Sequence, residues 1–260
     1  MDSAQKKIAM VLEYHGSPFV GWQYQPGQRT VQGVLHDALI TVLGKGCVWG
    51  VESSGRTDSG VHARGQVVTF NTSREDLDCK KLALSISSLL RGEVGVLRAG
   101  VVDASFHPRK GVLFKEYRYY ILNRAIPPTL DAGFVWHVRR PLDVDFLRQE
   151  SSSLLGQHNF SAFRGAECNN FSVFKELFSI NINKVGDVVE IAITGSGFLK
   201  QMVRIIVGTL VDRARNKLHL NLHEILELET RSNSGVTAPA HGLFLHSVKY
   251  SDAALGWLSV

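Results

Sequence analysis

The chain has 260 residues, 44% of them hydrophobic and 20% charged, and its 29 Lys and Arg against 24 Asp and Glu give a formal net charge of +5. This composition excludes a disordered protein, because it supplies a substantial core for one large domain or two smaller ones. The positive charge favours a polyanionic partner without identifying one.

The cysteines and the beginning of the chain bear on cellular location. Cys47, Cys79 and Cys168 are too far apart for a CxxC motif, and their odd number argues against a disulfide framework. Residues 1–7 are polar and lead directly into a predicted strand, and no apolar run approaches the ~20 residues that cross a bilayer. We therefore expect a cytoplasmic protein without a signal peptide or a membrane span.

The first hundred residues predict the order β-α-β-β-α-β. Thr30 can cap a helix that Gly44 ends, and Asp76 or Asp78 can cap a second one. The predicted elements are a strand at 8–14, a helix at 31–43, strands at 47–52 and 66–71, a helix ending at 90 and a strand at 94–102. This order suggests an antiparallel sheet with helices on one face, in which the loop at 53–65 joins two adjacent strands.

The second half repeats this mixture of strands and helices. Its predicted elements are a tyrosine-rich strand at 113–123, a helix from Asp143 to 155, a hairpin of 177–184 and 188–194 around Gly186, helices at 199–215 and 222–229, and a strand at 243–250. We expect an α+β protein with two ferredoxin-like halves, 1–105 and 106–260.

The loop at 53–66 is the strongest candidate for an active site. It carries Asp58 between Arg56 and Arg64, with glycines at 55, 60 and 65. Nearby positive charge favours the ionised carboxylate that a nucleophile or base needs, and the glycines let a substrate approach the backbone. From the residues alone, a turn residue or half of a structural ion pair stays open as the role of Asp58.

Two further segments could contribute to a site: the tyrosine-rich strand that carries Tyr117 and the apolar helix that carries Arg204. Alternation on the tyrosine-rich strand places Tyr117 and Tyr119 on one face, where a ring could stack on a base or simply pack in the sheet. Arg204 lies in a very apolar helix and needs a counter-charge unless it reaches solvent at the helix edge. Gly208, one turn later, leaves space for something to lie against the helix.

Metal and triad chemistry are poorly supported. His219 and His223 are four residues apart, but Leu220 stands where a zinc protease motif has glutamate, and no third ligand is evident. His62 could pair with a serine or cysteine nucleophile, yet the chain has no nucleophile elbow. We expect neither a metal nor a cofactor.

Four separated motifs resemble the TruA family of tRNA pseudouridine synthases, in the order that the family has them. They are the Gly-Arg-Thr-Asp-Ser-Gly-Val-His loop at 55–62, Phe-His-Pro-Arg at 106–109 followed by Tyr-Arg-Tyr at 117–119, Phe-Leu-Lys-Gln-Met-Val-Arg at 198–204, and Ala-His-Gly-Leu at 240–243. The chain departs from the family pattern at 110–116 and 169–174. The resemblance implies that the sheets of the two halves join into one extended sheet with a central active-site cleft.

The resemblance also implies an activity and roles for individual residues. The reaction would isomerise uridine to pseudouridine at positions 38, 39 and 40 of the tRNA anticodon arm, in a homodimeric enzyme that needs no cofactor. Asp58 would be the catalytic nucleophile, Arg204 its ion-pair partner and Tyr117 the ring that stacks on uracil. Substrate binding would fall to a set of basic residues, Arg56, His62, Arg64, Arg109 and Arg164.

Two other functions stay open on the sequence. A catalytically silent RNA-binding protein on the same scaffold would bind tRNA without forming product. A small-molecule hydrolase using Asp58 would release a free leaving group and would be indifferent to RNA.

Overall fold

The computed structural model describes residues 5–166, 172–251 and 253–258. Within these ranges the chain forms ten strands, paired mostly antiparallel, and five α-helices, which confirms the expected α+β class. Cys168 and the first three residues of the departure at 169–174 lie outside the described residues. The chain has two compact units, Met1–Leu113 with Leu245–Val260 (unit 1) and Phe114–Phe244 (unit 2). The domain division at residue 105 stays a prediction.

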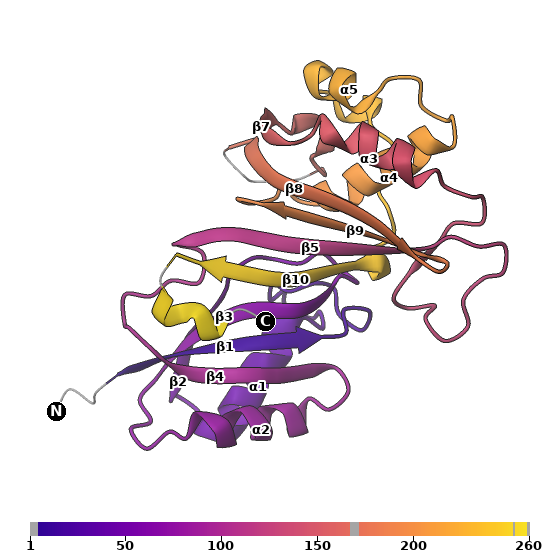
Figure 1. Cartoon of the computed structure of the whole chain (residues 1–260). Coiled ribbons are helices and arrows are strands. Elements are labelled where there is room, and N and C mark those ends of the chain that lie inside the picture. Colours follow the sequence, from indigo (N-terminus) through magenta and orange to yellow (C-terminus); the bar gives the residue numbers. More distant parts are fainter. Residues whose placement is uncertain (1–4, 167–171, 252, 259–260) are drawn as a thin grey trace. The chain divides into compact units, whose positions relative to one another are not determined.

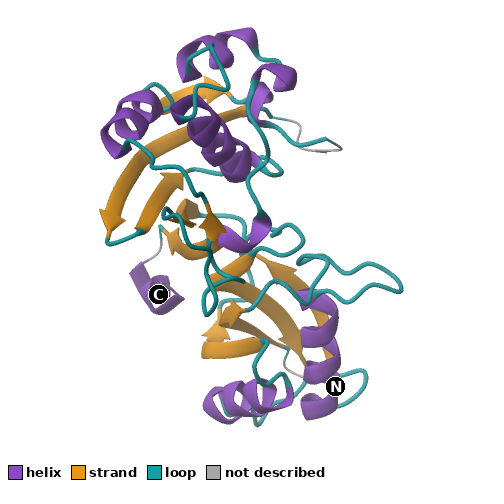
Figure 2. Cartoon of the chain, turned by 90° about the vertical axis from the view of Figure 1, so that its right-hand side faces the viewer, coloured by secondary structure: helices purple, strands orange, loops and turns teal. Residues whose placement is uncertain are grey.

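Unit 1 is built from the predicted β-α-β-β-α-β order. Its elements are β1 (Lys6–Tyr14), α1 (Val31–Leu43), β2 (Val48–Ser53), β3 (His62–Thr72), α2 (Cys79–Leu89) and β4 (Val94–Val102). The strands lie in the order β4-β1-β3-β2 with every pair antiparallel, so the two strands that flank the Asp58 loop are neighbours as expected. The helices α1 and α2 pack side by side along the strands (Figures 1 and 2).

The local signals that start these helices are confirmed. The hydroxyl of Thr30 accepts a hydrogen bond from Gly33 N, and the carboxylate of Asp78 accepts from the N–H groups of residues 80 and 81. Met10 on β1 lies opposite Val68 on β3, and both are fully buried. Burial of this kind on the central strands anchors the sheet that carries the Asp58 loop.

Unit 2 contains the tyrosine-rich strand and the Arg204 helix. Its elements are β5 (Val112–Leu122), which enters it at Phe114, β6 (Trp136–His137), α3 (Val144–Ser152), β7 (Gly156–Asn159), η1 (Ser161–Phe163), β8 (Phe174–Val185), β9 (Val188–Gly195), α4 (Met202–Ala214), α5 (Leu222–Leu228), η2 (Arg231–Asn233) and η3 (Ala240–Gly242). The strand order is β5-β9-β8-β7, with β6 parallel to the end of β5. The helix α3 packs on β8 and α4 (Figure 1).

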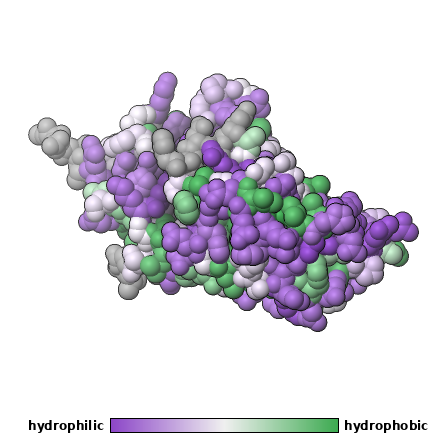
Figure 3. Space-filling view, turned by 90° about the horizontal axis from the view of Figure 1, so that it is seen from above, coloured by the Kyte–Doolittle hydropathy of each residue, from purple (hydrophilic) through white to green (hydrophobic). Residues whose placement is uncertain are grey.

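The last strand, β10 (Leu243–Tyr250), returns the chain to unit 1, where the 3-10 helix η4 (Ala253–Leu258) follows it. Among the described residues, no helix combines the length and the apolar character needed to cross a membrane. The described residues on the face seen in Figure 3 are predominantly hydrophilic, with hydrophobic residues in small separate patches.

Several element boundaries differ from those predicted, and three of the differences have a clear physical cause. The strand β3 begins at His62, four residues earlier than expected, because Ala63 pairs with Tyr14 on β1. The helix α4 begins at Met202 because Gln201 has a left-handed backbone with φ of 62°. The third helix ends at Ser152, which leaves Gly156–Asn159 to form the unpredicted strand β7 against β8.

Candidate active site

The Asp58 loop is a short turn held at both ends by paired strands. It spans residues 54–61 between β2 and β3, and Asp58 is half-buried within it. Its carbonyl oxygen accepts a hydrogen bond from Val61 N at 3.1 Å, which closes the turn around Ser59 and Gly60. The carboxylate therefore projects from a backbone of defined conformation.

A second loop, residues 15–22 after β1, fixes the turn from the other side. Trp22 N donates to Thr57 O at 3.1 Å, and Gly60 N donates to Phe19 O at 3.3 Å. The contact is close, because a Cβ added at Gly21 would lie 2.8 Å from Thr57 O, and the φ of Gly21 is +100°. Trp22 itself is buried, so this support is part of the core.

Side-chain hydrogen bonds complete the scaffold beneath the turn. The hydroxyl of Tyr14 lies 2.8 Å from Thr57 Oγ1 in a buried contact. Burial raises the pKa of Tyr14 to about 12, so its hydroxyl stays protonated even above the pH at which a free tyrosine ionises. At the start of the loop, Gln66 accepts from Ser54 Oγ at 2.6 Å and donates to Gly55 O at 2.7 Å. These hydrogen bonds lie beneath the turn and fix the backbone that carries Asp58.

His62 is part of the same scaffold. Its side chain is fully buried, and its Nδ1 accepts a hydrogen bond from the buried Gly16 N–H at 3.0 Å. An accepting Nδ1 places the proton of the neutral imidazole on Nε2. The Gly16 backbone is also tightly packed, because a Cβ there would lie 2.1 Å from Val61 O. His62 therefore ties the loop after β1 to the C-terminal end of the Asp58 turn.

Three of the arginines predicted to bind substrate lie in unit 1. Arg56 and Arg64 are exposed, on the loop and on β3. Arg109 is exposed as well, and its Nε donates to Ser53 O at 3.1 Å, which ties the segment after β4 to the start of the Asp58 loop. All three guanidinium groups are thus carried on or beside this loop.

In unit 2, Tyr117 lies on β5 with its side chain 8% exposed. Tyr119 is fully buried on the same face, and Arg118 and Tyr120 are more exposed, as strand alternation predicted. The ring of Tyr117 meets Phe198 edge-on, with centroids 5.0 Å apart. The contact with Phe198 fixes the plane of the Tyr117 ring, of which only a small area is exposed.

The guanidinium of Arg204 is oriented by the chain segment that crosses α4. Arg204 Nε donates to Ala238 O at 2.7 Å, while Ala238 N donates to Arg204 O at 3.0 Å. The segment can cross the helix this closely because residue 208 is a glycine and has no side chain. A Cβ at Gly208 would lie 1.7 Å from Val236 O. The space that the sequence indicated beside Gly208 is therefore filled by the protein's own backbone, and Arg204 is half-buried next to it.

Arg164 lies next to a contact with the segment that precedes α4. It follows η1, is half-buried, and precedes Gly165, whose N–H donates to Lys200 O at 2.9 Å. A Cβ at Gly165 would lie 2.6 Å from Gln201 Oε1 and 3.1 Å from Lys200 O, so a side chain here would displace the Gln201 amide. Arg164 and Arg204 thus come from segments that meet around one helix.

The structure groups the predicted residues into two sets. The first, in unit 1, contains Asp58 with its neighbours, Arg56, His62, Arg64 and Arg109; the second, in unit 2, contains Tyr117, Arg164 and Arg204. Sequence reasoning missed the residues that support the Asp58 turn. Trp22 lay in a segment taken as a plain loop, and Tyr14 had the pattern of an ordinary strand residue. Among the described residues, no group of three or more His, Cys, Asp or Glu side chains could hold a metal ion.

A carboxylate on a rigid Arg-Thr-Asp turn, in an α+β protein of net positive charge, fits an enzyme that acts on RNA. Comparison with known families makes this specific. A family model described as tRNA pseudouridine synthase matches residues 10–109 and 151–251, which include the Asp58 loop and Arg204, whereas Tyr117 lies between the two matched ranges. The chain belongs to this family and is an isomerase that acts on tRNA.

Curated relatives match over nearly the whole chain. A tRNA pseudouridine synthase A of Brevibacillus brevis is 41% identical over 246 residues, covering 94% of this chain and 100% of that protein. Proteins of the same name from Geotalea daltonii and Myxococcus xanthus are 38% and 39% identical, covering 94% and 95% of this chain and 100% and 92% of their own length.

Proposed function

We propose that the protein converts uridine to pseudouridine in the anticodon arm of tRNA, at positions 38, 39 and 40, with Asp58 as the nucleophile. The observation that carries the assignment is the fixed backbone of the Asp58 turn, which is hydrogen-bonded to segments far away in the chain. A carboxylate held in this way needs little reorganisation when it meets its substrate.

The reaction needs only groups that the chain provides. The C1′–N1 bond breaks, the uracil rotates while it is held, C5 joins C1′, a proton leaves C5 and N1 gains one. No electron or group is transferred to a second molecule. A nucleophilic carboxylate, a ring that holds the base and cations that neutralise phosphate are sufficient.

The remaining residues have distinct proposed roles. Arg204 pairs with Asp58 and keeps it ionised, its orientation set through Ala238 O. Tyr117 stacks on the uracil, and Phe198 holds its ring. The exposed arginines Arg56, Arg64 and Arg109, with Arg164, contact tRNA phosphates, a contribution that weakens as salt rises.

His62 was expected to bind substrate, but its full burial favours a different proposed role. It acts from inside the protein by holding the Gly16 loop against the Asp58 turn. We also propose that the enzyme is a homodimer, as the resemblance to its family implies, and that it works in the cytoplasm, as its three widely spaced cysteines favour. Sedimentation at two protein concentrations tests the dimer.

The first experiment measures tritium release from tRNA labelled at uracil C5. The wild type should release tritium, and Asp58→Asn should not, although it should still bind tRNA. Release by Asp58→Asn at the wild-type rate would remove Asp58 from the mechanism. tRNA variants with cytidine at position 38, 39 or 40 identify the target, because each should lose only its own share of the release.

The Arg204 proposal needs its own comparison. Arg204→Lys keeps the charge but loses the Nε–H that donates to Ala238 O, whereas Arg204→Ala loses both. We expect Arg204→Lys to retain more turnover than Arg204→Ala, with both variants binding tRNA. Equal turnover in the two variants and the wild type would refute the ion pair.

For Tyr117, the conservative variant Tyr117→Phe keeps the ring face and removes the hydroxyl. We expect its KM for tRNA to stay near the wild-type value, because stacking depends on the ring. Complete loss of tRNA binding in this variant would contradict the stacking role.

A further inference from the structure

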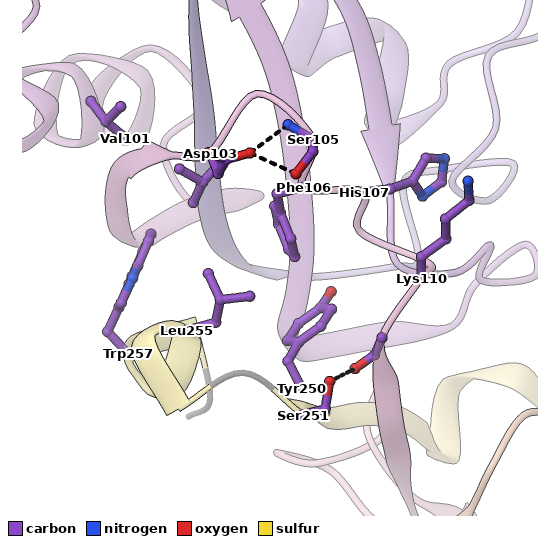
Figure 4. Close-up of a pocket in the computed structure, with 12 residues that line it drawn as sticks. Val101, Asp103, Ser105, Phe106, His107, Lys110, Tyr250, Ser251, Leu255 and Trp257 are labelled. Atoms are coloured by element: carbon purple, nitrogen blue, oxygen red, sulfur yellow. Dashed lines mark hydrogen bonds between the residues drawn. The ribbon is translucent and has the colours of Figure 1, made fainter.

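Unit 1 contains a cavity of about 420 Å³ that the proposed reaction does not use (Figure 4). This volume lies in the range of small-molecule and cofactor sites. The cavity is formed where the end of β4, the segment after β4, the end of β10 and η4 meet. Its lining residues include Val101, Phe106, Lys110, Tyr250, Leu255 and Trp257. We call it the Phe106–Trp257 pocket.

The apolar walls of the pocket are held in place. Phe106 meets Tyr250 edge-on with ring centroids 5.3 Å apart, and the Tyr250 hydroxyl donates to Pro108 O at 2.7 Å. Figure 4 shows Leu255 and Trp257 rising from η4 on the other side. The pocket is therefore lined by aromatic rings from two parts of the chain.

The η4 wall is anchored by its own contacts. A Cβ added at Gly100 would lie 3.1 Å from the ring of Trp257, so the indole packs directly on β4. Arg98 Nη1 donates to Trp257 O at 2.8 Å, and Leu258 is fully buried. Together these contacts keep η4 against the strand, and the cavity is formed before any ligand arrives.

Polar groups surround the aromatic walls. Asp103 accepts hydrogen bonds from Ser105 N at 2.8 Å and from Ser105 Oγ at 2.6 Å, and it is exposed at the cavity. Lys110 is exposed at the opposite side from Asp103 in Figure 4, next to His107. An apolar, aromatic interior with a hydrogen-bond acceptor and a cation at its edge suits a planar heterocycle attached to a phosphate chain.

The segment that forms this wall is connected to the Asp58 loop. Arg109 Nε donates to Ser53 O at 3.1 Å, and His107 Nε2 lies 3.5 Å from Glu52 Oε2 on β2. The exposed cations of this segment, Arg109 and Lys110, thus extend from the start of the catalytic loop to the pocket. A polyanion bound at the loop is the ligand that this charge arrangement favours.

We propose that the Phe106–Trp257 pocket binds an unpaired nucleobase of the tRNA substrate, other than the uridine that reacts. This proposal rests on the tRNA pseudouridine synthase activity. The base stacks on the aromatic walls, Asp103 accepts a hydrogen bond from a base N–H, and Lys110 contacts an adjacent phosphate. The pocket thereby contributes to tRNA affinity and to the choice of tRNA, while bond breaking and formation take place at Asp58.

Two variants test the proposal by opposite changes. Trp257→Ala removes a stacking wall, and Leu255→Trp fills the pocket, because Figure 4 shows the Leu255 side chain directed towards Phe106 and Tyr250. Each should raise the KM for tRNA about 5- to 150-fold, the range that removal of one base–aromatic stack implies. The kcat at saturating tRNA should stay within about twofold of the wild type.

A matched control is Trp49→Ala on β2, which removes a partly exposed tryptophan that does not line the pocket. Its KM should stay within about twofold of the wild type. If Trp257→Ala also lowers the melting temperature, Leu255→Trp decides, because it keeps Trp257 and Leu258, whose contacts anchor η4. A wild-type KM in Leu255→Trp would overturn the proposal.

Photochemical cross-linking gives an independent readout. Ultraviolet irradiation of the wild type with unmodified tRNA, followed by peptide mass spectrometry, should attach a nucleotide to peptides containing Phe106, Tyr250 or Trp257. Cross-links confined to other peptides would contradict base binding here. The same preparation is assayed for tritium release, so wild-type turnover without these cross-links would refute the pocket proposal and leave the proposed function standing.

Discussion

Replacing His62 by asparagine and by glutamine separates the position of one acceptor atom from the presence of a polar side chain. In His62→Asn the amide oxygen can take the place of Nδ1, which accepts from Gly16 N at 3.0 Å. In His62→Gln the corresponding oxygen lies one bond further out, where Nε2 stands in the wild type. The buried Gly16 N–H therefore keeps an acceptor only in the first variant.

The size of the effect follows from the burial of this hydrogen bond. A buried N–H without an acceptor costs about 1–3 kcal/mol. If that free energy holds the Gly16 loop against the Asp58 turn, its loss lowers kcat by about 5- to 150-fold. We expect this loss in His62→Gln and a kcat within about threefold of the wild type in His62→Asn, with KM for tRNA little changed in both.

A merely structural role predicts the opposite order. Asparagine is the smaller side chain and leaves the larger cavity at a site that is fully buried, so His62→Asn should be the less stable of the two variants. Urea unfolding and single-turnover tritium release on the same preparations measure both properties. If kcat followed stability, with His62→Asn the slower enzyme, the positioning role would be refuted.

Two further predictions concern the supports of the site. Gly208→Ala forces a methyl group to within 1.7 Å of Val236 O, so it should lower the free energy of unfolding by about 1–3 kcal/mol or more. It should also reduce turnover, because it displaces Ala238 O, the hydrogen-bond partner of Arg204. The control is Gly256→Ala, whose methyl group meets nothing within 4 Å and should change the free energy of unfolding by less than about 0.5 kcal/mol. Tyr14→Phe leaves the Thr57 hydroxyl without its buried partner and should lower the free energy of unfolding by about 1–3 kcal/mol. The double variant Tyr14→Phe with Thr57→Val should lose less free energy of unfolding than the two single variants together, because both changes remove the same hydrogen bond. Because burial raises the pKa of Tyr14 to about 12, the folded protein holds this proton more tightly than the unfolded chain. The free energy of unfolding therefore stays at its full value below about pH 10 and falls as the pH rises towards 12, where the unfolded chain loses this proton more readily than the folded protein. Urea unfolding of the wild type and of Tyr14→Phe across this pH range measures the effect. An alkaline loss in Tyr14→Phe as large as that of the wild type would contradict the assignment.

Elements whose signals are local were predictable. Thr30 and Gly44 bound α1 as expected, because capping depends on residues within one turn of the helix end. The hairpin of β8 and β9 around Gly186 and the bounds of β10 follow from alternation and turn residues. The Asp58 loop was found because its composition matched neither a helix nor a strand.

Elements whose limits depend on distant partners were not predictable. His62 and the three residues after it have no alternating pattern that marks a strand, yet pairing of Ala63 with Tyr14 extends β3 to them. Gln201 carries no glycine signal, but its left-handed backbone delays the start of α4 until Met202. In both cases tertiary contacts override the local preference.

The sequence by itself determined the chemical groups of this protein: a carboxylate between arginines, a tyrosine on a strand and an arginine in an apolar helix. Only the tertiary structure decided what holds them. The Asp58 turn is supported by Tyr14 and Trp22, and the Arg204 guanidinium by Ala238 O, all more than thirty residues away. Such contacts leave no periodic trace in the sequence, because they arise only when folding brings separate segments together.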